Sequence, residues 1–170
     1  MMVSQPTPQT TFVPTILVVD DEPTIVKLCS DLLERGGFTV LQATGSSDAI
    51  RCCATFDGDI HLLLTDLVLR PANVRLAVCT QLYPHVHGHE LALRIAALRK
   101  GIRILFMSGN PDGELAGYGI QQGNLPFLRK PFDQDSLLHT IGEILSAPAP
   151  TLGLIVRETL TPKDTASIAA

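Results

Sequence analysis

Five short runs of apolar residues recur along the chain, and each is followed by polar residues. In the stretch from His61 to Leu69, three consecutive leucines directly precede Thr65 and Asp66. A continuous apolar run of this length is typical of a strand that is buried on both faces of a parallel sheet. The predicted strands are Thr15 to Val19, Phe38 to Ala43, His61 to Leu69, Ile102 to Met107 and Leu125 to Leu128.

Between these runs the apolar positions change to the spacing of an α-helix. The first helix is predicted to begin at Pro23, because proline suits the first helical position, and to end at Gly36 and Gly37. The other predicted helices are Asp48 to Ala54, His89 to Lys100, Leu115 to Gln121 and Asp133 to Leu145, the last with Asp133 as its N-cap. This alternation predicts five βα units, and therefore an α/β fold with a doubly wound parallel sheet and helices on both faces.

The repeating units predict one domain from residue 15 to residue 146. Residues 1–14 are rich in proline, threonine and glutamine and are expected to form a flexible tail, and residues 147–170 are too few for a second domain. Residues 70–87 interrupt the pattern, because a βα connection normally takes roughly 2 to 6 residues. We interpret them as an insertion between the third strand and the third helix.

Reactive side chains follow four of the predicted strands. Asp20 and Asp21 follow the first strand, Asp66 the third, Ser108 the fourth and Lys130 the fifth. The carboxyl ends of the strands are where ligands bind in an open α/β sheet. Because three carboxylates in a small site repel one another unless a cation lies among them, the pattern indicates Mg²⁺, an ion that prefers oxygen ligands.

Composition excludes several classes of protein. The chain has 170 residues and a formal net charge of −4, with no basic stripe, so we expect no direct contact with nucleic acid. It has no apolar run long enough to span a membrane and no signal peptide, and we expect a cytoplasmic protein. The four cysteines are expected to be reduced thiols, with neither a disulfide nor a zinc role.

Six sequence motifs together resemble the receiver domain of two-component response regulators. They are ILVVDDEP, VLQATGSSDAI, HLLLTDLVL, GHEL, ILFMSGNPD and FLRKPF, in that order between about Thr15 and Ser146. The resemblance implies the flavodoxin-like fold of CheY-like receivers, with strand order 2-1-3-4-5. It also implies that a histidine kinase transfers a phosphoryl group to an aspartate of this chain.

The resemblance also assigns roles to individual residues. Asp66 would be the phospho-acceptor, and Asp20, Asp21, Asp66 and the carbonyl of Val68 would hold Mg²⁺, with Asp21 binding directly and Asp20 through water. Ser108 and Lys130 would contact the phosphoryl group, the Lys130–Pro131 bond would be cis, and Ser108 and Phe127 would act as switch residues. Phe127 could equally be an ordinary core residue, and Glu22 is interpreted as an acid at a helix start.

One departure from the family pattern lies beside the predicted acceptor. Many more residues separate Asp66 from Gly88 than the resemblance implies, and residues 70–87 account for the excess. We predict that this insertion tunes the reaction or the choice of partner and is not needed for folding. His85, His87 and His89 form an H-x-H-x-H pattern, which we interpret as loop histidines in preference to a metal site.

The leading hypothesis is a phosphorelay response regulator that is not an enzyme in its own right. It would accept a phosphoryl group from a histidine kinase or a phosphotransfer protein and then change its binding to a downstream protein that the sequence does not identify. Two alternatives stay open: a receiver-fold interaction module that is rarely phosphorylated, and a Mg²⁺-dependent phosphohydrolase. A nucleotide or flavin binder is disfavoured, because the first turn is acidic and lacks a glycine-rich phosphate loop.

Overall fold

A computed structural model describes residues 12–69, 87–109 and 126–149. Its strands are β1 (Thr15–Val19), β2 (Thr39–Ala43), β3 (Leu62–Asp66), β4 (Arg103–Ser108) and β5 (Phe127–Arg129). Its helices are α1 (Pro23–Arg35), α2 (Ser46–Thr55), α3 (Gly88–Leu98) and α5 (Gln134–Ser146). The predicted tails, most of the insertion and the predicted helix from Leu115 to Gln121 lie outside the described residues.

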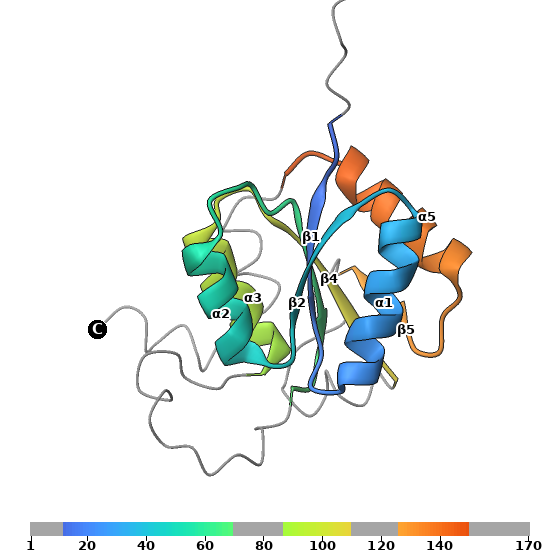
Figure 1. Ribbon diagram of the computed structural model, residues 1–170, viewed down its shortest axis with the longest axis horizontal. Helices are drawn as coiled ribbons and strands as arrows, with labels where there is room; N and C mark the ends of the chain where they lie inside the picture. Colours follow the sequence, from blue (N-terminus) through green and yellow to red (C-terminus); the bar gives the residue numbers. More distant parts are fainter. Residues whose placement is uncertain (1–11, 70–86, 110–125, 150–170) are drawn as a thin grey trace, which may run out of the picture.

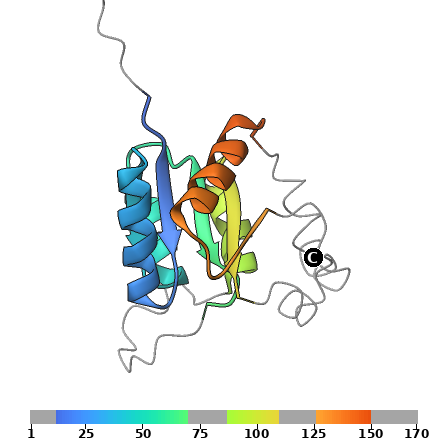
Figure 2. The same ribbon diagram turned by 90° about the vertical axis from the view of Figure 1, so that its right-hand side faces the viewer.

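The five strands form one parallel sheet in the order β2-β1-β3-β4-β5. Helices α1 and α5 cover one face of this sheet, and α2 and α3 cover the other (Figure 1). A view from the side shows the strands between the two helical layers (Figure 2). The predicted α/β class and the flavodoxin-like strand order are therefore confirmed.

The sheet separates two apolar cores, because successive side chains of a strand point to opposite faces. Leu17, Val19 and Leu63 pack on the side of α2 and α3, whereas Ile16 and Val18 pack on the side of α1 and α5. All five side chains are fully buried. Burial on both faces is the reason why these strands read as continuous apolar runs in the sequence.

The ends of the helices follow their local sequence closely. Helix α1 begins at Pro23, with Glu22 in the N-cap position, and the chain leaves it through Gly37 at a φ of 85°, a conformation that glycine adopts without strain. Asp133 caps α5 by accepting a hydrogen bond from the backbone N–H of Ser136 at 2.8 Å, as predicted.

Most predicted boundaries agree with the structure to within one or two residues, with one instructive exception. The stretch from His61 to Leu69 forms a strand only from Leu62 to Asp66. Beyond it, Leu67 and Leu69 are fully buried outside the strand, and the N–H of Leu67 donates to the carbonyl of Met107 at 2.9 Å. The apolar pattern continues past the strand because the core does.

Candidate functional site

The carboxyl ends of β1, β3 and β5 bring two acids and one lysine together. The Nζ of Lys130 donates to Oδ2 of Asp20 and to Oδ1 of Asp66, each at 2.7 Å. The two carboxylate oxygens are therefore separated by no more than twice that distance. Because β3 lies next to β1, while β5 ends beside β4, the topology alone places these three residues at one edge of the sheet.

Asp66 is held by its own loop as well as by Lys130. Its second oxygen, Oδ2, accepts the backbone N–H of Val68 at 3.0 Å. Burial raises the pKa of Asp66 from 3.8 to about 6, although the hydrogen bond and charge of Lys130 oppose this rise. The neighbouring carboxylate of Asp20 adds to the rise. Asp66 is thus an acid whose charged form is costly to keep in the folded protein.

Asp20 is the more deeply buried partner in the cluster. Its side chain is only 3% exposed, and Oδ1 accepts the backbone N–H of Glu22 at 2.9 Å while Oδ2 accepts Lys130. Burial disfavours the charged form of Lys130, but hydrogen bonds and charges from Asp20 and Asp66 outweigh this effect and raise its pKa. Lys130 therefore stays protonated and balances one of the two negative charges.

Asp21 lies next to this pair on the β1–α1 loop and is partly exposed. Within residues 12–69, 87–109 and 126–149, no group of three or more histidine, cysteine or acidic side chains is close enough to hold a metal ion. The carboxylates that share Lys130 are two, Asp20 and Asp66. Two are sufficient for Mg²⁺, which usually takes one or two carboxylates together with phosphate oxygens and water. Lys130 thus joins two of the three predicted carboxylates, and these two form a donor set that fits Mg²⁺.

The remaining predicted residues lie around this cluster. Ser108 is buried at the end of β4, and its carbonyl accepts the N–H of Lys130 at 2.8 Å. Phe127 is half-buried, and its ring stacks on Phe106 with a centroid separation of 5.4 Å. The peptide bond between Lys130 and Pro131 is cis, as the resemblance implies.

Lys130 also lines an apolar hollow of about 310 Å³. It is lined by Ile25, Leu28, Lys130, Pro131 and Phe132, so it lies between α1 and the chain that leads from β5 into α5. Leu28, which lines this hollow, is 48% exposed. The reactive cluster is therefore flanked by a surface on which another molecule can bury apolar groups.

Sequence reasoning missed two residues that contact the acceptor backbone. The hydroxyl of Thr65 donates to the carbonyl of Asp66 at 3.0 Å, and Gly88 packs against the same carbonyl. The GHEL motif contains Gly88, but nothing in the motif shows which backbone it approaches. His87 and His89 have nearly parallel rings with centroids 6.3 Å apart, and His85 lies outside the described residues.

The fold and the acid–lysine cluster together define a CheY-like receiver. A family model of the response regulator receiver domain matches residues 16–142. The chain therefore belongs to this family, whose members work in two-component systems. Members of the family generally accept a phosphoryl group, bind Mg²⁺ at the phosphorylation site and interact with histidine kinases.

Curated relatives agree with this membership. The chain is 30% identical over 134 residues to the DNA-binding transcriptional regulator NtrC of Rhizobium meliloti, and 25% identical over 149 residues to the transcriptional regulatory protein GlrR of Escherichia coli K12. These alignments cover 79% and 88% of this chain. The chain spans only 24% and 30% of the length of those two regulators.

Solved structures show the same fold. A response regulator receiver protein from Sinorhizobium medicae aligns with a TM-score of 0.62 at 22% identity, covering 79% of this chain and 96% of that one. NtrX from Brucella abortus aligns with a TM-score of 0.62 at 25% identity, covering 79% of this chain and 27% of that one. No helix among the described residues is long and apolar enough to cross a membrane.

Proposed function

We propose that this receiver domain accepts a phosphoryl group on Asp66 and thereby switches its binding to another protein. The observation that carries the proposal is the position of Lys130, whose ammonium group lies 2.7 Å from an oxygen of Asp66 and 2.7 Å from an oxygen of Asp20. A carboxylate becomes a useful nucleophile toward phosphorus when positive charge offsets the negative charge that the phosphoryl group brings. Lys130 supplies that charge at the oxygen itself.

In the proposed transfer, a carboxylate oxygen of Asp66 attacks the phosphorus of a phosphohistidine. A new O–P bond forms, the P–N bond to the donor imidazole breaks, and its electron pair stays on the imidazole nitrogen. Asp66 must be ionised to attack, and the ammonium group of Lys130, 2.7 Å from its Oδ1, favours that ionised form. The N–H of Val68 holds Oδ2 and thereby orients the carboxylate.

Mg²⁺ is the cofactor that we propose for this site. Asp20 and Asp66 would hold it, with Asp21 and the carbonyl of Val68 as the further ligands that the family resemblance assigns. When bound, the ion would neutralise charge on the phosphoryl oxygens.

The residues around Asp66 suggest how a partner protein detects phosphorylation. Ser108 lies one strand away from Asp66, at the end of β4, and β4 pairs with β5 through Phe106 and Phe127. We propose that Ser108 binds the new phosphoryl group and that Phe127 then reorients over Phe106. A partner protein would sense this change as a shift in the populations of two conformations.

We further propose that the phosphodonor is a histidine kinase or a phosphotransfer protein. The apolar hollow beside Lys130 supports this, since Ile25, Leu28 and Phe132 offer a partner helix an apolar surface within reach of the acceptor. The insertion of residues 70–87 begins two residues after Val68, so a role in partner choice stays part of the proposal.

The test is phosphorylation by acetyl phosphate in the presence of Mg²⁺, followed by intact mass measurement and peptide mapping. We expect the wild-type protein to gain one phosphoryl group on Asp66, and Asp66→Asn to gain none while keeping its fold. Asp31→Asn is the matched control, because Asp31 is an exposed acid on α1 that pairs with Lys27 and takes no part in the site. Uptake by Asp66→Asn would place the acceptor elsewhere. No uptake by the wild type would favour an interaction module.

A further inference from the structure

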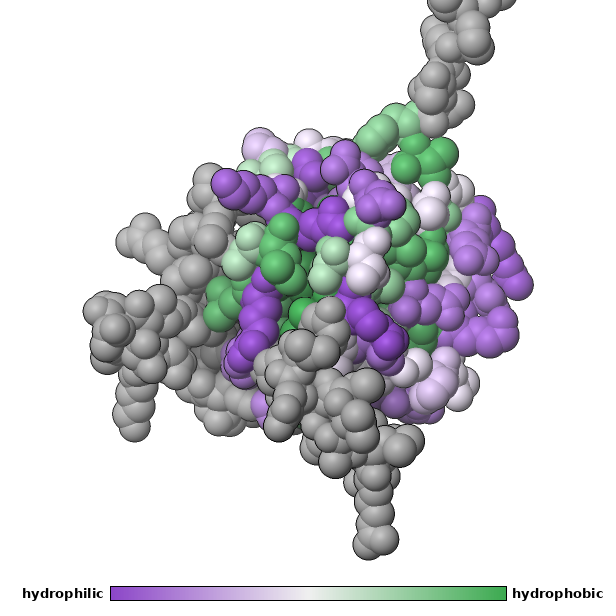
Figure 3. All heavy atoms as spheres, turned by 60° about the vertical axis from the view of Figure 1, so that its left-hand side comes forward, coloured by the Kyte–Doolittle hydropathy of each residue, from purple (hydrophilic) through white to green (hydrophobic). Residues whose placement is uncertain are grey.

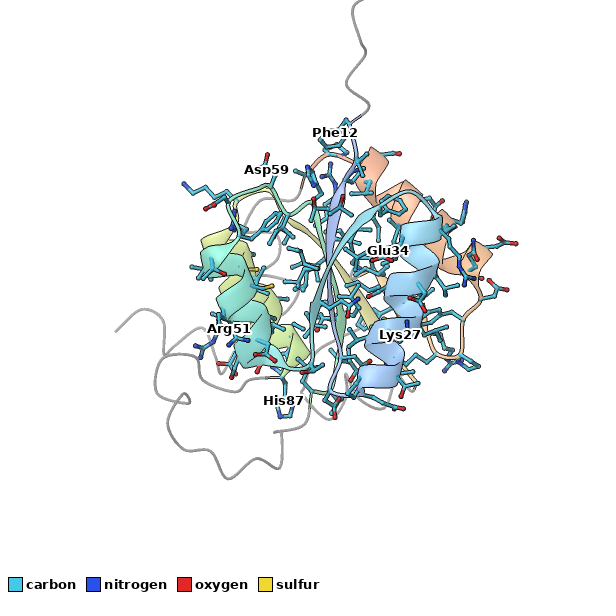
Figure 4. All side chains as sticks on the ribbon, viewed as in Figure 1. Phe12, Lys27, Glu34, Arg51, Asp59 and His87 are labelled. Atoms are coloured by element: carbon cyan, nitrogen blue, oxygen red, sulfur yellow. The ribbon has the colours of Figure 1, made fainter. Side chains whose placement is uncertain are left out.

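Gly88 occupies the point at which the chain returns to the acceptor strand. It is the first residue of α3 and is buried, and its N–H donates to the carbonyl of Leu67 at 3.1 Å. Its neighbour His87 lies at the lower end of the molecule in Figure 4, where the strands end, and Phe12 and Asp59 mark the opposite end. The start of α3 is thus fixed directly to the backbone that follows Asp66.

A side chain at this position has no space. A Cβ atom on Gly88 would lie 2.0 Å from the carbonyl oxygen of Asp66, and 3.0 Å from both the carbonyl carbon of Asp66 and the Cα of Leu67. All three atoms belong to the backbone, so no rotamer change can relieve the overlap. Ordinary contacts of a Cβ begin at 3.4 Å, and the two segments would have to separate by more than 1 Å to reach that distance.

Other glycines in the molecule are different. A Cβ on Gly36 would meet the end of the flexible Leu138 side chain, and a Cβ on Gly142 would meet nothing within 4 Å. Of these three glycines, only Gly88 lies so close to the backbone of another segment that a Cβ atom would overlap it. It cannot be explained by a left-handed backbone, because among the described glycines only Gly37 and Gly101 have a positive φ.

We propose that Gly88 is a positioning residue for the phosphoryl transfer. Because it has no side chain, the start of α3 packs directly on the backbone of Asp66 and fixes the position of that residue. The carbonyl that Gly88 contacts belongs to the acceptor residue itself and also accepts the hydroxyl of Thr65 at 3.0 Å. On the other side of the same residue, the carboxylate is held by Val68 at 3.0 Å and by Lys130 at 2.7 Å. A displacement of this backbone by about 1 Å would thus also move the nucleophilic oxygen.

The expected effect is large because charge-assisted hydrogen bonds of this length tolerate little displacement. A reacting group that is misplaced by about 1 Å can lose roughly a hundredfold in rate. The inference rests on the proposed function, since it assumes that Asp66 is the acceptor. It adds that helix α3, and not only the residues at the strand ends, determines how fast the acceptor reacts.

The experiment compares Gly88→Ala with Gly142→Ala in the full chain, with acetyl phosphate as donor and saturating Mg²⁺. We expect the maximal rate of Gly88→Ala to fall by about tenfold to a hundredfold, with a smaller change in the donor concentration that gives half the maximal rate. Gly142→Ala should keep both values within about twofold of wild type, because its new methyl group meets no atom. A folded Gly88→Ala protein with the wild-type maximal rate would overturn the inference.

A measurement on the wild type covers the case in which Gly88→Ala does not fold. The backbone amide resonances of Gly88 and Gly142 are followed while Asp66 is phosphorylated. We expect Gly88 to shift and Gly142 to stay, because only Gly88 shares a hydrogen bond with the backbone after Asp66. An unmoved Gly88 resonance in a protein with phosphorylated Asp66 overturns the inference alone, whereas a wild type that takes up no phosphate overturns the proposed function as well.

Discussion

Two basic residues hold two different parts of this domain together, and they do so in different ways. Lys130 lies at the carboxyl ends of the strands between the carboxylates of Asp20 and Asp66. Arg99 lies at the end of α3, near the opposite edge of the sheet, and donates to backbone carbonyls of Cys53, Phe56 and Gly58. One cation is thus satisfied by charges and the other by neutral dipoles.

The difference separates a reactive site from a structural one. The partners of Lys130 can be protonated, phosphorylated or bound by a metal, so the strength of its contacts depends on the state of the protein. The carbonyls around Arg99 have one state only. They end α2 and begin the following loop, and Arg99 satisfies acceptors that the helix leaves unpaired. Replacing each cation should therefore affect different measurements.

The largest effect is expected from Lys130→Met, which removes the ammonium group and keeps an apolar chain of similar length. The rate of phosphorylation by acetyl phosphate should fall by about a hundredfold to a thousandfold, the loss typical of removing one group that stabilises transition-state charge. Arg99→Met is the matched control and should react at the wild-type rate at temperatures at which it is folded. A Lys130→Met protein within about tenfold of wild type would contradict the role proposed for Lys130.

Replacing Arg99 should mainly lower the free energy of unfolding. Arg99→Ala removes hydrogen bonds from a charged donor to three carbonyls, and we expect a loss of about 2 to 4 kcal/mol in the free energy of unfolding. Arg99→Lys should recover less than half of this loss, because an ammonium group cannot reach several carbonyls as a planar guanidinium does. Urea unfolding measures both. Full recovery by lysine would show that charge alone, and not the fork geometry, holds α2.

Figure 3 shows the side of the molecule that carries α2 and α3, where polar and apolar residues are interspersed. Phe12, which Figure 4 labels at the upper end of the molecule, is 71% exposed, and Val13 is 46% exposed. Phe12 meets the ring of His61 edge to face with a centroid separation of 4.9 Å.

A smaller effect is expected in the pH dependence of stability, because Asp66, the partner of Lys130, titrates and the carbonyl partners of Arg99 do not. Burial raises the pKa of Asp66 from 3.8 to about 6, so the folded protein binds a proton more tightly than the unfolded chain does. Its contribution therefore favours folding most at low pH and is lost as the pH rises from 3.8 to about 6. We expect Asp66→Asn to gain stability relative to wild type over this range, by an amount on the order of 1 to 3 kcal/mol.

Mg²⁺ bound at Asp66 would lower the pKa of this carboxyl, so the stability titration is measured without added Mg²⁺. Arg99→Met should show no stability difference from wild type that varies in this range, because its carbonyl partners do not titrate. A stability difference between wild type and Asp66→Asn that is constant from pH 3.8 to well above 6 would contradict the burial of a charged Asp66.

The contrast between the two basic residues also explains what could be predicted from sequence. Asp20, Asp66 and Lys130 follow apolar strands, and the parallel topology brings such residues to one edge without knowledge of any contact. Arg99 and Gly88 carry no comparable pattern, since their roles depend on which backbone atoms approach them from distant parts of the chain. The sequence analysis predicts that this helix begins at His89, whereas α3 begins one residue earlier at Gly88, where the tight contact with the backbone of Asp66 leaves no space for a side chain.

The smallest effect on stability is expected from shortening residues 70–87, which we interpret as an insertion after the acceptor strand. Its two flanks are fixed within the domain, because Leu69 is fully buried and the N–H of Gly88 donates to the carbonyl of Leu67. A shorter loop of family length should then change the free energy of unfolding by less than about 1 kcal/mol, since halving a loop changes its closure entropy by only about 0.6 kcal/mol. Thermal and urea unfolding of the shortened protein measure this directly. A much larger loss would show that the segment contributes to the core. An unchanged stability together with a changed rate of phosphorylation would show that the segment acts on the reaction alone, as its position two residues after Val68 leads us to expect.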